Sequence, residues 1–228
     1  LHDFSPGLPA TTPAVQAELH YGVRTAVPAF SFLDERTGSI DMMMQPEAAK
    51  RVEADLSAQA EGVLRGGSSW SNIYTGGAAQ EESHFCAASI GLGDMWRTGK
   101  IGTIFSFAFL HFPSFLRLVA LLPLELIIAL ADALRGVTQR QKWTRELSFV
   151  IARVFVCVGL REMITLGTKI DLARGLPIIH VNYLGYDEQS HRRGPSSAFA
   201  HWTLRGIDRS IKQLHRAARR SGRRDYDV

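Results

Sequence analysis

An aspartate and a histidine stand four residues apart near the C-terminal end of the sequence. Asp187 and His191 bound the segment Asp-Glu-Gln-Ser-His, which is followed by Arg-Arg-Gly-Pro. A carboxylate oxygen and an imidazole nitrogen are ligands that suit zinc, and a loop can fold both onto one ion. Two ligands do not complete such a site, so a second interpretation stands beside the first. In that interpretation Asp187 caps a turn and His191 is a surface histidine.

The sequence around this pair predicts a strand before it and a helix after it. A near-continuous apolar run over residues 177–184 predicts a strand buried on both faces. A Gly-Pro-Ser-Ser turn at 194–197 precedes a long helical pattern. Strand, polar loop and helix form the repeating unit of a parallel sheet, in which ligands collect beyond the carboxyl ends of the strands. We therefore expect Asp187 at a ligand-binding edge of an α/β domain.

The pattern Asp-x-x-x-His-x-x-Gly-Pro resembles the metal-binding loop of a known enzyme family. This family is the nucleotide pyrophosphatase/phosphodiesterase (type I phosphodiesterase) branch of the alkaline phosphatase superfamily. The resemblance implies that Asp187 and His191 bind one zinc ion of a two-zinc centre. It also implies an α/β fold, part of an alkaline-phosphatase-like three-layer sandwich with a mainly parallel sheet.

A threonine near the N-terminal end carries the same resemblance. In that branch the nucleophile lies in a Thr-Pro-rich turn that opens a helix, with a glycine ten residues downstream, as Gly22 follows Thr12 here. The resemblance implies that Thr12 is the nucleophile and touches the metal centre, with Thr11 in that role if the register is shifted by one. Metal coordination is one of the few ways to obtain an alkoxide near neutral pH, and a helix N-terminus favours a bound phosphate. Without the resemblance, Thr12 would be interpreted as a helix N-cap.

The activity implied is metal-dependent hydrolysis of a phosphate-ester or nucleotide-like small molecule through a covalent phosphothreonine. The family also has an aspartate at the end of its first strand and a Ser-Asp-His-Gly motif, and neither occurs here. We therefore expect the chain to be an internal piece, with the remaining metal ligands before Leu1 and after Val228. A sulfatase is disfavoured because no Cys-x-Pro-x-Arg is present. The alternatives are a phosphomonoesterase or phosphonate-cleaving relative and a catalytically inactive, membrane-associated interaction module.

Two apolar segments in the middle of the chain predict a helical hairpin. The first covers residues 101–134 and the second residues 143–166. Arg117, Glu125 and Asp132 interrupt the first segment and Pro113 and Pro123 break it, which argues against a bilayer span of about 20 apolar residues. The hairpin could pack internally, form a homodimer surface or touch a membrane interface. The resemblance implies an insertion typical of a bacterial membrane-linked subgroup, which divides the chain into 1–100, 101–166 and 167–228.

Two shorter elements are predicted in the first hundred residues. Pro46 opens a helix that Gly66 ends, because Val52, Leu56 and later apolar residues recur at helical spacing. Residues 70–74 predict a short strand.

Composition and charge narrow the class of protein. The chain has 228 residues, of which 46% are hydrophobic, so disorder, collagen and a disulfide scaffold are excluded. Cys86 and Cys157 lie in apolar sequence and are predicted to be buried thiols.

The net charge is +4, and residues 192–228 alone carry ten Lys and Arg against three Asp. Most of these basic residues fall between apolar residues at helical spacing, so we interpret them as a solvated helix face and not as a nucleic-acid site. The apolar residues of this helix form the stripe Leu204, Ile207, Ile211, Leu214 and Ala218.

Overall fold

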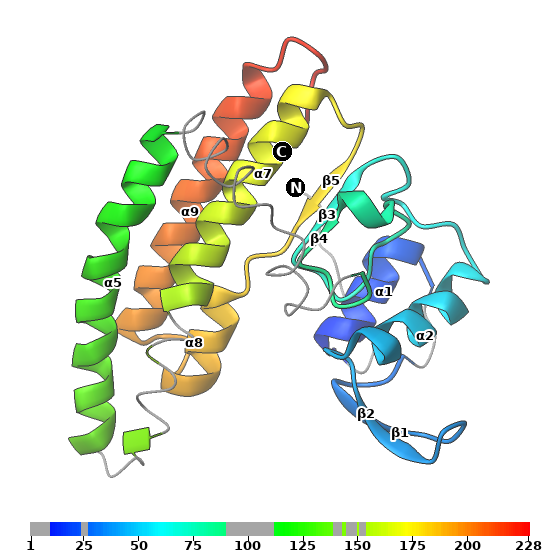
Figure 1. Ribbon diagram of the computed structural model, residues 1–228, viewed down its shortest axis with the longest axis horizontal. Helices are drawn as coiled ribbons and strands as arrows, with labels where there is room; N and C mark the ends of the chain where they lie inside the picture. Colours follow the sequence, from blue (N-terminus) through cyan, green and yellow to red (C-terminus); the bar gives the residue numbers. More distant parts are fainter. Residues whose placement is uncertain (1–9, 24–26, 90–111, 139–142, 145–149, 151–153) are drawn as a thin grey trace. The chain divides into compact units, whose positions relative to one another are not determined.

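The structure is a computed structural model that describes residues 10–23, 27–89, 112–138, 143–144, 150 and 154–228. The chain divides into two compact units, which are described separately (Figure 1). Unit 1 consists of Leu1–Gly99 and Arg174–Asn182, and unit 2 consists of Lys100–Ala173 and Tyr183–Val228. The division into 1–100, 101–166 and 167–228 stays a prediction.

A three-stranded parallel sheet forms the centre of unit 1. Its order is β4 (Ser83–His84), β3 (Ser68–Trp70) and β5 (Ile179–Val181), and the 3₁₀ turn η1 (Gln80–Glu82) leads into β4. Trp70 pairs with His84 on one side and with Val181 on the other. The expectation of an α/β fold with a parallel sheet is confirmed at this level.

Both predicted strands of this sheet are shorter than expected. Only Trp70 of the strand predicted over residues 70–74 belongs to β3, because Ser71 takes a left-handed backbone conformation (φ 58°) and turns the chain. The strand predicted over residues 177–184 is reduced to β5, whose residues are half-buried. The prediction of burial on both faces is wrong for β5.

Two helices and a hairpin complete unit 1. They are α1 (Thr12–Tyr21), α2 (Pro46–Ser57) and the antiparallel pair β1 (Ser31–Asp34) and β2 (Ser39–Met42). Helix α2 begins at Pro46 as predicted but ends at Ser57, well before Gly66. Beyond the helix, the backbone N–H of Val63 donates to His20 and that of Leu64 donates to Gly76, so this segment bonds to other parts of the unit. The core consists of Ala17, Tyr21, Val27, Met43, Ala49, Leu56, Ile73, Tyr74, Ala87 and Ala88.

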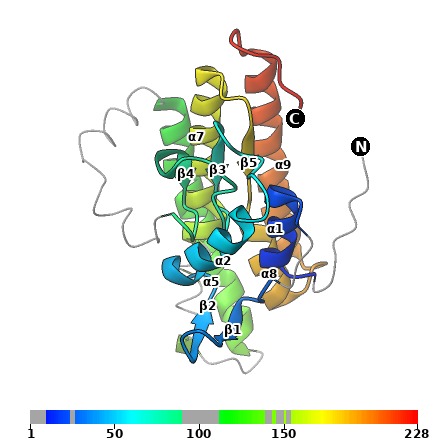
Figure 2. The ribbon, with the colours of Figure 1, turned by 90° about the vertical axis from the view of Figure 1, so that its right-hand side faces the viewer.

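Unit 2 is helical over the residues that the structure describes. Its elements are α5 (Phe112–Thr138), the π-helix η2 (Phe155–Leu160), α7 (Arg161–Arg174), α8 (Gly185–Arg193) and α9 (Ala198–Arg219). Figures 1 and 2 show that α5, α7 and α9 run alongside one another within the unit. No helix in the described ranges combines the length and apolarity needed to cross a bilayer.

The predicted hairpin is present in part. Helix α5 passes through Pro123 without a break, which corrects the expectation that this proline ends it. The second helical segment continues past residue 166 to Arg174. Residues 101–111, 139–142, 145–149 and 151–153 of the predicted hairpin lie outside the described ranges.

The predicted stripe of α9 is partly wrong. Leu214 and Ala218 are buried, but Leu204 and Ile211 are about half exposed, and the rest of the buried side is small: Ala200, Thr203, Gly206 and Ser210. Small residues are needed there because bulky groups lie against the helix, such as the guanidinium of Arg161, which occupies the space that a Cβ at Gly206 would take. The basic side chains from Arg205 to Arg220 are exposed, as predicted.

Candidate functional site

The first turn of α1 carries the threonine that the sequence singled out. Thr11 is the N-cap residue, with extended backbone, and Thr12 is the first helical residue, followed by Pro13. The interpretation of Thr12 as the N-cap is therefore wrong. The Thr11 side chain makes no capping bond, and among the described residues its buried Oγ1 has no hydrogen-bond partner. Because the amides of a first turn have no partners within their own helix, they are available to an anion.

Gln16 connects this turn to the carboxyl end of β3. It lies one turn after Thr12 on the same face of α1, since residues four apart share a helix face. Its Oε1 accepts from the backbone N–H of Ile73 (2.7 Å), and its Nε2 donates to Oδ1 of Asn72 (3.3 Å). Ile73 and Asn72 belong to the loop that follows β3. The face of α1 that carries Thr12 is therefore bonded to the edge of the sheet where α/β proteins bind ligands.

The loops that follow β3 and β4 each begin with an unusual backbone conformation. Ser71 follows β3 and Phe85 follows β4, and both are non-glycine residues with positive φ (58° and 57°). Such conformations cost free energy and occur often at binding and catalytic sites. Ser71 is buried, and its backbone N–H donates to the carbonyl of His84, which holds the two strand ends together.

Two imidazoles meet beside Asn72. Nε2 of His20 lies 3.1 Å from Nδ1 of His180, and the rings are perpendicular with centroids 4.7 Å apart. Nδ1 of His180 also lies 3.1 Å from Oδ1 of Asn72. The bond from Ile73 N–H fixes the amide of Gln16, and Gln16 in turn fixes the amide of Asn72 with its oxygen toward His180. Nδ1 of His180 is therefore assigned as the protonated nitrogen that donates to this oxygen.

Both imidazoles are held neutral. Burial, reinforced by the charge of His180, lowers the pKa of His20 to about 3. Burial also lowers the pKa of His180 below its ordinary value. Among the described residues, Nδ1 of His20 has no hydrogen-bond partner. Protonating this ring would put an N–H on both of its nitrogens, and the N–H at Nε2 would face the protonated Nδ1 of His180. Burial of a charged ring without acceptors is unfavourable.

Asp187 and His191 lie in a helix and not in the loop that we expected. Helix α8 begins at Gly185 and ends at Arg193, and Gly194 (φ 88°) terminates it. Its acidic residues fall in the first turn and its basic residues in the last, the arrangement that a helix dipole stabilises. This distribution of charge along residues 185–193 favours a helix over the expected loop.

The two side chains meet on one exposed face of α8. Oδ1 of Asp187 lies 3.3 Å from Nε2 of His191, and the side chains are 70% and 80% exposed. Two ligands of a tetrahedral zinc ion, each bonded at about 2.0–2.1 Å, are about 3.4 Å apart, so the donor atoms fit one ion without rearrangement. As a simple ion pair, the same contact would stabilise the helix by only about 0.3–0.5 kcal/mol.

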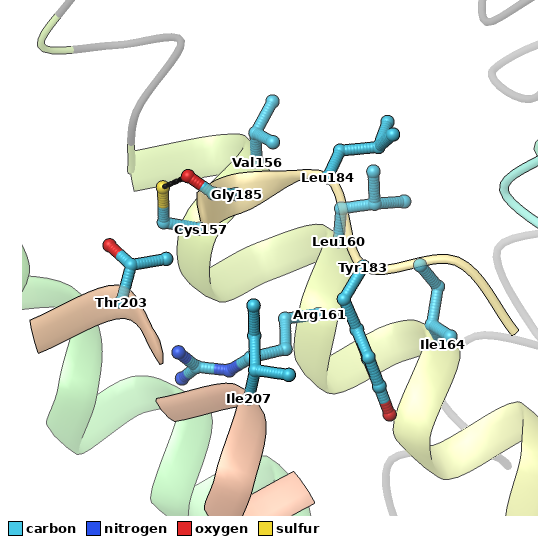
Figure 3. A pocket seen from close by; sticks show the side chains of 10 residues that line it. All are labelled: Val156, Cys157, Leu160, Arg161, Ile164, Tyr183, Leu184, Gly185, Thr203 and Ile207. Carbon is cyan, nitrogen blue, oxygen red and sulfur yellow. Dashed lines mark hydrogen bonds between the residues drawn. The ribbon is translucent and has the colours of Figure 1, made fainter. Parts of the chain in front are cut away.

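The small cavity of unit 2 is too small for a substrate. Figure 3 shows side chains from η2, α7 and α9 around it, with the guanidinium of Arg161 beside Ile207 and below Thr203. Its volume is about 10 Å³, at most the space of one water molecule. Cys157 at its edge is buried and is not part of a disulfide, and the same holds for Cys86 in unit 1, so the prediction of buried thiols is confirmed.

The structure brings together Asp187 and His191 within unit 2, and it places Thr12 in unit 1. Sequence reasoning missed the network of Gln16, Asn72, His20 and His180. The available signal was polar residues inside otherwise apolar segments, such as His180 between Ile179 and Val181. No family model, curated protein or solved structure matches this chain, so the resemblance rests on its motifs alone.

Proposed function

We propose that this protein is a metal-dependent phosphoric ester hydrolase of the phosphodiesterase or nucleotide pyrophosphatase type. The observation that carries the proposal is the pair of Asp187 and His191, whose donor atoms lie 3.3 Å apart on an exposed helix face. We also propose that the three-stranded parallel sheet of unit 1 belongs to an alkaline-phosphatase-like three-layer sandwich.

Asp187 and His191 are the residues that would hold a divalent cation, zinc by the chemistry of the donor set. An imidazole nitrogen and a carboxylate oxygen are both common zinc ligands. The resemblance implies two zinc ions in the intact site, with Thr12 beside the second. When bound, such ions lower the pKa of a coordinated hydroxyl or water and neutralise charge on phosphate oxygens.

Thr12 is the proposed nucleophile. Its Oγ1 loses its proton and forms a bond to phosphorus, the ester bond to the leaving group breaks, and the leaving oxygen takes up one proton. Water then hydrolyses the phosphothreonine and releases phosphate or a phosphate monoester. Pro13 has no backbone N–H, so the first turn of α1 offers the N–H groups of Thr12 and Ala14 to phosphate oxygens. The Gln16 bonds to Ile73 and Asn72 hold this turn in place.

Thr12 is tested by three variants of the full-length protein with bis(p-nitrophenyl) phosphate and zinc. We expect Thr12→Ala to lower kcat by at least about a thousandfold, as removal of a covalent nucleophile does, and Thr12→Ser to keep part of the activity. Thr11→Ala is the matched control and should stay within about tenfold. Acid quenching followed by mass spectrometry should find a p-nitrophenyl phosphoryl group on residue 12. Unchanged turnover in Thr12→Ala would remove this residue from the mechanism.

The cation pair is tested without any activity measurement. Cobalt(II) reports ligand binding through its visible spectrum, and we expect Asp187→Asn and His191→Gln each to weaken cobalt and zinc binding by about tenfold or more. Glu188→Gln, on the same turn of α8, is the control and should leave binding unchanged. Equal affinity in all three variants would show that Asp187 and His191 form only a surface ion pair.

A catalytically inactive interaction module is the second candidate function. The observation that favours it is the row of exposed leucine and isoleucine side chains on α5. A full-length protein that binds zinc but turns over neither phosphodiesters, phosphomonoesters nor phosphonates would support this candidate. The same panel of substrates separates the phosphodiesterase from its phosphomonoesterase and phosphonate-cleaving relatives.

A further inference from the structure

Helix α5 presents its polar side to unit 2 and its apolar side outward. Glu125 and Asp132 are 3% and 2% exposed, and Ala129 and Gly136 are buried on the same side. The large side chains on the opposite side are 42–68% exposed: Leu116, Val119, Leu124, Leu126, Ile127, Leu130 and Leu134. A helix on the surface of a monomer normally has the reverse arrangement.

The buried carboxylates fix this orientation. Nε1 of Trp202 donates to Glu125 (2.5 Å), and Nε of Arg193 donates to Asp132 (2.9 Å). Both partners belong to unit 2, on α9 and α8. Turning α5 to bury its leucines would leave these buried groups unpaired, at a cost of about 3–5 kcal/mol for each broken pair. Among the described residues of unit 2, the apolar side therefore faces away from α8 and α9.

The size of this surface matches a protein interface. The exposed side chains run from Leu116 to Leu134, about 27 Å along the helix at 1.5 Å per residue. Their exposed area is on the order of 600–700 Å², close to the ~800 Å² that each partner contributes to a standard interface. It is also at or above the largest apolar patch of a typical monomer.

The spacing of the exposed residues favours a helix as the partner. Leu116, Pro123 and Leu130 recur every seven residues, and Val119 and Leu126 recur between them at three and four. This is the spacing at which side chains of two helices interdigitate along a seam. Every exposed side chain that the structure describes between Leu116 and Leu134 is apolar, so these side chains bring no like charges together when two copies of the face meet.

We propose that the outer face of α5 binds a second copy of this chain, with the two α5 helices antiparallel across a two-fold axis. In this arrangement the same patch lies on both subunits, as an isologous interface requires. The antiparallel direction sets the opposite ends of the two helix dipoles beside each other. Leu126 lies near the axis and Leu116 at the periphery. Figure 1 shows that α5 lies at the edge of unit 2.

Sedimentation equilibrium of the full-length protein tests the proposal. We expect a dimer, and we expect Ile127→Glu to raise its dissociation constant by at least about a hundredfold, because the interface buries the new charge. Ile40→Glu is the matched control, since Ile40 is on β2 and is 73% exposed. It should leave the dimer unchanged. Circular dichroism checks that both variants are folded, which their exposed positions favour.

Cross-linking tests the face directly. Leu126→Cys should form a disulfide-linked dimer under mild oxidation, while Leu116→Cys should not, and the native Cys86 and Cys157 are buried. A monomer at all concentrations, or a dimer that Ile127→Glu leaves intact, would overturn the proposal. Binding of the monomer to phosphatidylcholine vesicles through this face would also overturn it, because the occupant would then be lipid.

Discussion

At the scale of single residues, Glu53 is the main acceptor in the interior of unit 1. Its Oε1 accepts from the hydroxyls of Tyr21 (2.6 Å) and Thr75 (2.8 Å) and from the backbone N–H of Gly76 (2.9 Å). Burial, followed by the bond to Glu53, raises the pKa of the Tyr21 phenol well above its ordinary value. One carboxylate oxygen thus joins α1, α2 and the loop after β3.

We predict that Glu53→Ala lowers the free energy of unfolding by about 2–4 kcal/mol, because three buried donors lose their acceptor. Glu53→Gln is the matched control, since its Oε1 can still accept all three bonds. It should cost less than half as much. Urea unfolding followed by circular dichroism measures both, and equal costs would mean that the carboxylate is not the shared acceptor.

The imidazole of His20 predicts a dependence of stability on pH. Its pKa is lowered from the ordinary 6.5 to about 3 in the folded state, so the unfolded chain binds the proton more readily. The stability contribution is complete above pH 6.5 and is lost as the pH falls toward 3, at up to about 1.4 kcal/mol per pH unit.

His20→Gln removes this titration. We therefore expect the unfolding free energy of the variant to fall less steeply than that of the natural protein between pH 6.5 and pH 4. Urea titrations at four pH values in this window provide the comparison. Parallel curves would show that His20 does not cause the pH dependence.

At the scale of elements, close backbone approach determines how β3 and β5 meet. A Cβ at Gly67 would lie 2.1 Å from the carbonyl oxygen of Ile178 and 2.6 Å from its Cγ2. The adjacent Ser68 N–H donates to the same carbonyl (3.0 Å). A backbone oxygen cannot move aside without breaking this bond.

Gly67→Ala is accordingly expected to lower the unfolding free energy by about 2 kcal/mol or more, through separation of the two strands. Gly222→Ala serves as control, because no atom lies within 4 Å of its added Cβ. It should change stability by less than about 0.5 kcal/mol. Thermal unfolding by calorimetry would reveal the difference, and a neutral Gly67→Ala would contradict the observed strand spacing.

In unit 2, the ion pair between Asp132 and Arg193 joins α5 to α8. Asp132→Ala leaves the Arg193 guanidinium without this carboxylate, and we expect a loss of about 3–5 kcal/mol, as for other broken buried pairs. Leu134→Ala, two residues away and 68% exposed, should cost less than about 1 kcal/mol in the monomer. Denaturant unfolding of the two variants at a concentration below the dimer dissociation constant makes the comparison, and similar losses would argue against the pair.

At the scale of the whole molecule, each unit has its own interior. Unit 1 packs Tyr74, Met43 and Leu56 around α1 and α2, whereas unit 2 buries Val158, Ile164 and Leu214 among its helices. Separate cores unfold as separate cooperative units when few interactions couple them.

Hydrogen exchange measured by mass spectrometry tests this division. We predict that Gly67→Ala speeds exchange in α1, β3 and β5 and leaves α5 and α9 unchanged. Asp132→Ala should have the opposite distribution. Faster exchange throughout the chain in either variant would mean that the two units unfold together.

The sequence by itself determined the elements whose signals are local. Pro46 began a helix because its fixed φ suits a first turn, and the Gly-Pro-Ser-Ser turn preceded the long C-terminal helix. The sequence singled out Asp187 and His191 by type and spacing, and only the structure shows that a helix holds their side chains 3.3 Å apart. Their role and that of Thr12 stay predictions.

Only the tertiary structure decided which faces are buried and which polar groups meet. The periodicity of α9 favoured Leu204 and Ile211 inside, but side chains such as Arg161 leave room only for small residues there. Hydropathy gave no sign that α5 turns Glu125 and Asp132 inward, because their partners are 77 and 61 residues away in sequence. The pairing of His20 with His180 spans 160 residues. Local patterns cannot encode such contacts, since they depend on which segments the packed chain brings together.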